Sequence, residues 1–183
     1  MGGHHLILGE LVDRITGETL PDTHDERYRQ KIAALLLDDK RYLKADIQPR
    51  LELLLRADAK KALIGVDFLV TLLEKPAMLI KYGPGSLVTR RRSCIAISRL
   101  LTPYQIPVVV ITNGEDAEII DGKSGKMLAS GLAGIPARAH LERRLADHVW
   151  QKMPLGRRQM ESRIAFCFEV DGACPCDDTI CRI

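Results

Sequence analysis

The chain has 183 residues, of which 46% are apolar, so it can bury one sizeable core and is predicted to form a single main domain. Its formal net charge of +3 is too small to establish a polyanion partner by itself. No apolar run approaches the roughly 20 residues that a membrane span needs, and the first residues lack the basic head of a signal peptide. We therefore expect a cytoplasmic protein with no membrane partner.

The N-terminal part predicts a small hairpin followed by a helix. Two weakly apolar pieces between residues 6 and 18 flank a Thr-Gly turn. Thr23 and Glu26 fit a capping box, and acidic residues crowd the first turn, so a helix should begin here and end near Asp39. The apolar residues at helical spacing on its packing face are Tyr28, Ile32, Leu35 and Leu36.

Three apolar runs follow at residues 47–55, 62–73 and 76–83, and three consecutive strands explain them most simply. The first two runs are close enough to form a hairpin. The second and third are almost continuously apolar, which is typical of central strands that are covered on both faces.

The second half alternates helices with a strong strand. We expect a helix over residues 86–101 with Ser86 as its N-cap, and a β-branched strand over residues 106–114 that ends in Asn-Gly. A helix between strands implies a crossover and parallel pairing. An edge hairpin is then predicted at 117–128, and amphipathic helices at 137–150 and 156–169.

The order of these elements is helix, strand, strand with Asp67, strand with Lys81, helix, strand. This is the layout of the PD-(D/E)xK nuclease core. The segments DERYRQKIAALLLDDKRY, VDFLVTLLEKP, AMLIKYG and IPVVVITNGEDAEIIDGKSGK carry a narrower resemblance, over roughly residues 23–126. The chain resembles the N-terminal domain of type I restriction enzyme R subunits, in a stand-alone form.

The resemblance implies an α/β fold: a restriction-endonuclease-like core in which helices flank a central mixed sheet. We expect this nuclease-like domain to cover residues 1–150, with a C-terminal helix and a short cysteine-rich tail in residues 151–183. A cytoplasmic nuclease-like domain of this kind would have DNA or another nucleic acid as its partner. The sequence leaves protein partners and oligomeric state open.

The same resemblance implies a Mg²⁺ site at which one carboxylate ends the second strand and a Glu-x-Lys lies on the third. Asp67 matches the carboxylate and Lys81 the lysine, with both side chains expected on one face of adjacent strands. Leu79 stands at the glutamate position, and an apolar side chain cannot ligate Mg²⁺. Glu26 matches the acidic residue of the family's first helix and is the third candidate catalytic residue.

Structural roles explain the same residues without a metal. Glu26 fits the capping box already described. Asp67, on an apolar strand, needs a partner if it is buried, and Lys81 would be an obvious one. A working half-site and a structural ion pair both stay open. The weakened motif predicts weak or absent Mg²⁺-dependent endonuclease activity.

A run of arginines opens the helix after the third strand. Arg90, Arg91 and Arg92 lie on its exposed side and, with Lys81 and Arg99, could contact phosphates. A solvated helix face is the alternative. Aromatic residues make up only 4% of the chain, so no stacking platform for single strands is expected.

Four of the five cysteines fall near the C-terminus, at Cys167, Cys174, Cys176 and Cys181. This clustering is unlike a secreted disulfide framework. Four thiolates can close a tetrahedral zinc site or hold an iron–sulfur cluster, although the spacing fits neither a zinc knuckle nor a ferredoxin run. An unmetallated tail is the alternative.

The favoured interpretation is therefore a nucleic-acid-binding protein of nuclease fold with an incomplete Mg²⁺ motif. Two other functions compete with it. One is a non-enzymatic interaction or scaffold protein built on the same fold. The other is a metal- or redox-sensing module that uses the C-terminal cysteines.

Overall fold

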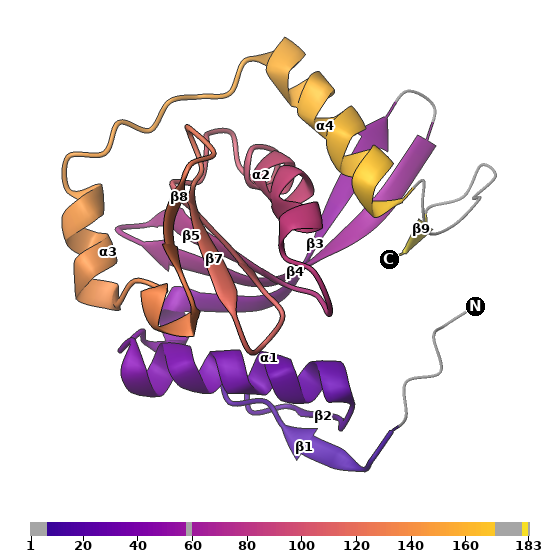
Figure 1. The fold of residues 1–183 in the computed structure, drawn as a ribbon, viewed down its shortest axis with the longest axis vertical. Coiled ribbons are helices and arrows are strands. Elements are labelled where there is room, and N and C mark those ends of the chain that lie inside the picture. Colours follow the sequence, from indigo (N-terminus) through magenta and orange to yellow (C-terminus); the bar gives the residue numbers. More distant parts are fainter. Residues whose placement is uncertain (1–6, 58–59, 171–180, 183) are drawn as a thin grey trace.

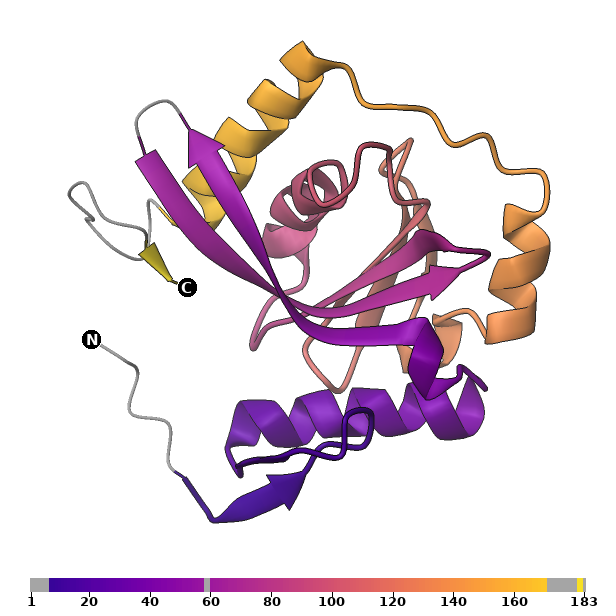
Figure 2. The same cartoon turned by 180° about the vertical axis from the view of Figure 1, so that it is seen from behind.

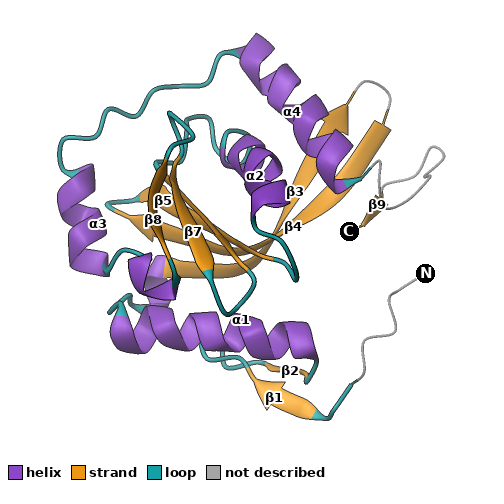
Figure 3. Cartoon of the chain, viewed as in Figure 1, coloured by secondary structure: helices purple, strands orange, loops and turns teal. Residues whose placement is uncertain are grey.

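A mixed β-sheet forms the centre of the computed structural model, which describes residues 7–57, 60–170 and 181–182. Six strands lie in the order β3-β4-β5-β6-β7-β8, with helices on both faces (Figures 1 and 3). A short strand, β9 (Cys181–Arg182), pairs in parallel with β4. The mixed α/β class predicted from the sequence is confirmed.

The other strands are β1 (Glu10–Val12), β2 (Thr19–Pro21), β3 (Ile47–Ala57), β4 (Lys60–Leu72), β5 (Lys75–Tyr82), β6 (Val108–Thr112), β7 (Ala117–Asp121) and β8 (Met127–Ser130). The α-helices are α1 (His24–Ala34), α2 (Arg91–Ser98), α3 (Arg138–Leu145) and α4 (Leu155–Glu169). In the described part of the chain, no helix is long and apolar enough to cross a membrane.

The N-terminal hairpin and the first helix form where the sequence predicts them. β1 pairs antiparallel with β2, and a π-helical turn, η1 (Leu35–Asp39), extends α1 to its predicted end. Thr23 caps α1, because its hydroxyl accepts a hydrogen bond from the backbone N–H of Glu26 at 3.2 Å. The Glu26 carboxylate does not complete the capping box: it accepts hydrogen bonds from Gln30 and Arg50 instead.

The predicted strand pairings are also confirmed. β3 and β4 form an antiparallel hairpin, and β5 joins β4 antiparallel. β6, which is buried along its whole length, pairs in parallel with β5 after the crossover through α2. β7 and β8 form the antiparallel hairpin at the sheet edge.

Helices cover both faces of this sheet (Figures 1 and 2), and an apolar core lies on each face. On one face α1, its extension η1 and α3 pack through Ile32, Leu36 and Leu141, and we call this the first core. On the other face α2 and α4 pack through Ile97 and Phe166, which we call the second core. The central strands are therefore covered on both sides, as their continuous apolarity predicts.

The Thr-Asn-Gly end of β6 is a tight turn that packs against Tyr28 of α1. The Asn113 side chain accepts hydrogen bonds from the backbone N–H groups of Glu115 and Asp116. Gly114 has φ 87°, and a Cβ atom there would lie 2.2 Å from the ring of Tyr28. Only glycine meets both conditions, which explains this triplet in physical terms.

Two expected helices are shorter than the sequence suggests. The segment after β5 starts with a 3₁₀ turn at Val88–Arg90, and the α-helix begins only at Arg91, without a side-chain cap. Ser86 therefore does not cap it; its carbonyl accepts a hydrogen bond from the Thr89 hydroxyl. α3 ends at Leu145, short of the predicted residue 150. The domain division at residue 150 stays a prediction.

The two-residue turn between β4 and β5 is a favourable place to stabilise the fold. Leu73 and Glu74 have φ 51° and 62°, in the left-handed region, which costs non-glycine residues about 1 kcal/mol or more each. Asn-Gly is the preferred pair for such a turn. We expect the double change Leu73→Asn and Glu74→Gly to raise the melting temperature by a few degrees, measured by circular dichroism.

A matched control is Gln48→Gly, at an exposed position of β3 whose φ is not left-handed. Glycine there should lower stability by about 0.5 to 1 kcal/mol. If the turn variant melts at or below the wild-type temperature, the left-handed strain at Leu73 and Glu74 is not a net cost to this fold.

Candidate functional site

The hydrogen-bond ladders of the sheet are interrupted at Asp67. The register of the two hairpins places Asp67 opposite Arg50 on β3 and, by extension, opposite Lys81 on β5, yet neither pair belongs to the ladder. Arg50 has φ 51° within its strand. Val66 packs in the second core and Phe68 in the first, so β4 changes the face it presents at this point. The sheet therefore bends where its charged row lies.

The Asp67 carboxylate is buried and held by two donors. Arg29 Nε on α1 donates to Oδ1 at 2.6 Å, and the backbone N–H of Tyr82 donates to Oδ2 at 2.6 Å. The Arg29 guanidinium also lies 5.5 Å from the centroid of the Tyr82 ring. One arginine thus neutralises Asp67 and joins α1 to the end of β5.

Glu26 lies one turn before Arg29 and belongs to the same charge network. Its Oε2 is 3.5 Å from Arg29 Nη1, and its Oε1 accepts a hydrogen bond from Arg50 Nη2 at 2.9 Å. Arg50 also donates to Asp13. Three carboxylates and two guanidiniums therefore alternate in the order Asp13, Arg50, Glu26, Arg29, Asp67, which we call the carboxylate–arginine chain.

Lys81 has different partners from Asp67. Its ammonium group is 3.0 Å from Glu169 Oε2 of α4 and donates to the carbonyl of Gly65 at 3.0 Å. Asp67 turns toward α1 and Lys81 toward α4, helices of opposite faces. The predicted adjacent strands are confirmed, and both side chains line one cavity, but Asp67 and Lys81 have different partners. The alternative of an Asp67–Lys81 pair is wrong.

The three predicted catalytic residues nevertheless line one cavity of about 370 Å³ between α1 and the bent strands. Its charged lining residues are Glu26, Arg29, Arg50, Glu52, Asp67 and Lys81. The sequence pointed to Glu26, Asp67 and Lys81 but missed both arginines. The available signal was the spacing of Arg29 three residues after Glu26, which places the two side chains on one face of a helix.

This cavity does not fit a Mg²⁺ ion. Mg²⁺ requires oxygen ligands in near-octahedral geometry. Here Asp67 and Glu26 converge on the Arg29 guanidinium, Glu52 is the third carboxylate of the lining, and Leu79 is fully buried in the second core. The positive charge beside Asp67 and Glu26 is therefore the guanidinium of Arg29.

A family model described as the type I restriction enzyme R protein N terminus matches residues 24–136, well over half of the chain. The chain belongs to this family. Searches of curated proteins and of solved structures found no match. Membership makes the chain a nuclease-related domain, and the match includes the whole segment from α1 to the β7–β8 hairpin.

The arginine run of this R-protein domain is half-buried rather than exposed. Arg91 binds both oxygens of Glu118, and Arg92 Nη1 lies 2.8 Å from Glu161 of α4. Arg90 donates to the Pro84 carbonyl at 2.7 Å. These contacts hold α2 against β7, α4 and the loop after β5.

Arg99, which was grouped with the run as a phosphate contact, is buried with 9% of its surface exposed. Its guanidinium donates to Glu161, Gln105 and the backbone carbonyls of Gly122 and Lys123. Arg99 therefore joins α2 and α4 to the β7–β8 turn. Its surroundings give it a structural role that the charge pattern alone did not reveal.

The predicted cysteine metal site lies only partly within the described residues. Cys174 and Cys176 fall outside them. Cys167 is exposed on α4, and Cys181 is paired by its backbone with Ala62 of β4. Among the described residues, no cluster of three or more metal-ligating side chains occurs. Zinc or an iron–sulfur cluster at these cysteines stays a prediction.

The carboxylate–arginine chain should make stability depend on pH through Asp13. Burial disfavours the charged form, but hydrogen bonds from the Thr16 backbone, Arg50, Gln30 and the Ile15 backbone outweigh it and lower the pKa of Asp13 from 3.8 to about 2. A lowered pKa stabilises the folded state above the unfolded-state value and is lost as the pH falls through 3.8 toward 2.

We therefore expect wild type to exceed Asp13→Asn in free energy of unfolding by about 2 kcal/mol near pH 6. The difference should shrink between pH 4 and pH 2, measured by urea unfolding. Asp38→Asn, which removes an exposed partner of Arg14, is the control and should show little difference at any pH. A constant gap for Asp13→Asn across this range would contradict the ionised role of Asp13.

Proposed function

We propose that this R-protein N-terminal domain binds DNA without cleaving it, because Arg29 replaces the metal of a nuclease site. The observation that carries the proposal is the 2.6 Å hydrogen bond from Arg29 to Asp67, with Glu26 beside the same guanidinium. A carboxylate that receives a charged donor is stabilised by about 1.5 to 3 kcal/mol per hydrogen bond. Mg²⁺ would have to displace this donor and would find Leu79 where a further oxygen ligand is needed.

The arrangement explains why the carboxylates persist without a metal. Asp67 and Glu26 are both largely buried, and a buried carboxylate without a partner is costly. Arg29 and Arg50 neutralise them and connect α1 to β3 and β4. The residues inherited from a nuclease site therefore act as a structural ion network.

The proposal predicts that removal of Arg29 exposes metal affinity that wild type lacks. Arg29→Met removes the guanidinium and retains a long apolar stem. We expect it to bind Mn²⁺ at least about tenfold more tightly than wild type, measured by electron paramagnetic resonance of the free ion. This affinity should disappear in the double variant Arg29→Met/Asp67→Asn. Neither the wild type nor Arg29→Met should cut supercoiled plasmid with Mg²⁺.

Arg27→Met is the matched control, because Arg27 lies on the same helix but is about half exposed and pairs with Asp22. It should leave Mn²⁺ binding at the wild-type level, and thermal unfolding should establish that each variant is folded. Mg²⁺-dependent cutting by wild type that Asp67→Ala abolishes would show a working metal site. Cutting that survives Asp67→Ala would place an active site elsewhere, and either result rejects the proposal.

Family membership supports DNA as the partner, since R proteins belong to restriction enzymes. The surface around α2 is the first candidate for contact. Side chains of Arg91 and Arg92 are each more than a third exposed although their inner edges bind Glu118 and Glu161. A guanidinium has five donors, so both can bind a carboxylate and still offer donors to a phosphate.

We expect the triple change of Arg90, Arg91 and Arg92 to alanine to weaken binding of a DNA duplex. Each lost phosphate contact should reduce the slope of log affinity against log salt by about 0.9, measured by fluorescence anisotropy at several salt concentrations. A triple alanine variant at exposed Lys31, Arg41 and Arg143 removes the same charge elsewhere. If both variants change affinity and slope equally, the α2 surface is not the contact.

A further inference from the structure

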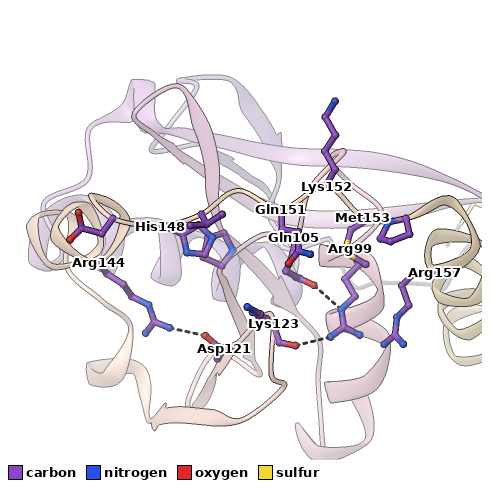
Figure 4. Close-up of a pocket in the computed structure, with 14 residues that line it drawn as sticks. Arg99, Gln105, Asp121, Lys123, Arg144, His148, Gln151, Lys152, Met153 and Arg157 are labelled. Carbon is purple, nitrogen blue, oxygen red and sulfur yellow. Dashed lines mark hydrogen bonds and ion pairs between the residues drawn. The ribbon is translucent and has the colours of Figure 1, made fainter.

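A second cavity, of about 620 Å³, lies at the C-terminal end of α2, where Arg99 lines it (Figure 4). Its walls come from the α2–β6 connection, the β7–β8 turn, the segment that joins α3 to α4, and the first turn of α4. The residues that line it include five cations, Arg99, Lys123, Arg144, Lys152 and Arg157, but only two carboxylates, Asp121 and Asp147. The candidate nuclease site includes none of these residues.

The excess of positive charge extends beneath the cavity. Glu161 is fully buried, and three guanidiniums lie on it: Arg92 at 2.8 Å, Arg99 at 2.6 Å and Arg157 at 2.8 Å. One carboxylate cannot neutralise three guanidiniums. The floor of the cavity therefore keeps a positive charge that the protein does not balance locally.

The rim of the cavity also has more positive than negative charge. Asp121 is bound by Arg144 at 2.9 Å and by the Ser124 hydroxyl at 2.8 Å, so its charge is already matched. Within the described residues, the ammonium groups of Lys123 and Lys152 have no carboxylate partner. Lys152 points away from the other labelled side chains (Figure 4), and Asp147 is the second carboxylate of the lining.

His148 lies on the cavity wall, and its pKa reflects the positive charge of its surroundings. Burial, Arg144 and Lys123 lower its pKa, and the nearby Asp121 does not compensate. Its ring packs edge-on against Trp150 at a centroid distance of 4.8 Å, and Trp150 packs in the same way against Tyr104. The imidazole is therefore held in place, neutral near pH 7, in a positive environment.

We propose that this cavity binds the phosphate group of a small phosphorylated ligand of nucleotide size. An uncompensated cluster of lysine and arginine attracts phosphate, and guanidiniums and ammonium groups are its usual protein donors. Pro107, Val149, Met153 and Pro154 give the cavity an apolar wall for the rest of the ligand. Its volume falls within the range of about 300 to 1,000 Å³ that is typical of small-molecule sites.

The test is an NMR titration of the folded protein with adenosine 5′-diphosphate, inorganic pyrophosphate and unphosphorylated adenosine. His148→Gln identifies the imidazole signal among the five histidines. A bound phosphate should raise the pKa of His148 by about 0.5 or more, because an anion at close range favours the charged imidazole. We expect saturable shifts with the diphosphate and pyrophosphate, and none with adenosine.

The change Lys123→Ala should weaken diphosphate binding by about tenfold or more. Lys126→Ala, on the same hairpin but outside the cavity lining, is the control and should bind as wild type does. A DNA duplex is the second arm. Shifts of His148 with DNA alone would assign the cavity to a nucleic-acid surface, and no shift with any phosphorylated probe would show that no phosphate binds; both overturn the proposal. Neither outcome depends on whether Arg29 occupies the metal position beside Asp67, so this test is independent of the proposed function.

Discussion

The ion pair between Arg29 and Asp67 is the interaction on which the arrangement of this domain depends. Asp67 lies where β4 turns from one face of the sheet to the other, and a bend of this kind leaves backbone groups without ladder partners. The carboxylate resolves this by accepting the Tyr82 N–H at 2.6 Å, while Arg29 supplies the countercharge from α1. The helix, the bent strand and the end of β5 are thereby fixed to one another through a single side chain.

The same principle recurs on the other face. Glu161 of α4 is fully buried and bound by arginines from α2 and from its own helix. The two networks differ in sign, because the chain around Asp67 has more carboxylates than guanidiniums and the cluster around Glu161 has the reverse. Around Asp67 the guanidiniums lie between the carboxylates and neutralise them, whereas around Glu161 the excess of guanidinium suits an anion.

The sequence predicts the fold well because its elements are locally encoded. The alternation of apolar runs gives β3 to β6, Thr23 marks the start of α1, and the Asn-Gly pair marks the end of β6. It predicts the site less well, because ion pairs form between residues 38 and 24 positions apart, as in Arg29–Asp67 and Arg50–Glu26. No periodicity records such contacts. The bend at Asp67 is equally hidden, since β4 is almost continuously apolar on both sides of it and its alternation gives no sign of a change of face.

The buried carboxylates also constrain how a nuclease site can be lost. Once an apolar residue stands at position 79, a metal has too few oxygen ligands, and Asp67 and Glu26 become buried charges without a partner. Removing Asp67 would leave the Tyr82 N–H at the strand bend without its acceptor, and removing Glu26 would leave Arg50 and Gln30 without one of theirs. An arginine placed one turn after Glu26 satisfies both at once, because its guanidinium spans the distance between them and cannot lose its charge. Under the proposed function, arginine suits this position because its planar fork reaches Asp67 through Nε and Glu26 through Nη1, whereas lysine has one compact ammonium group.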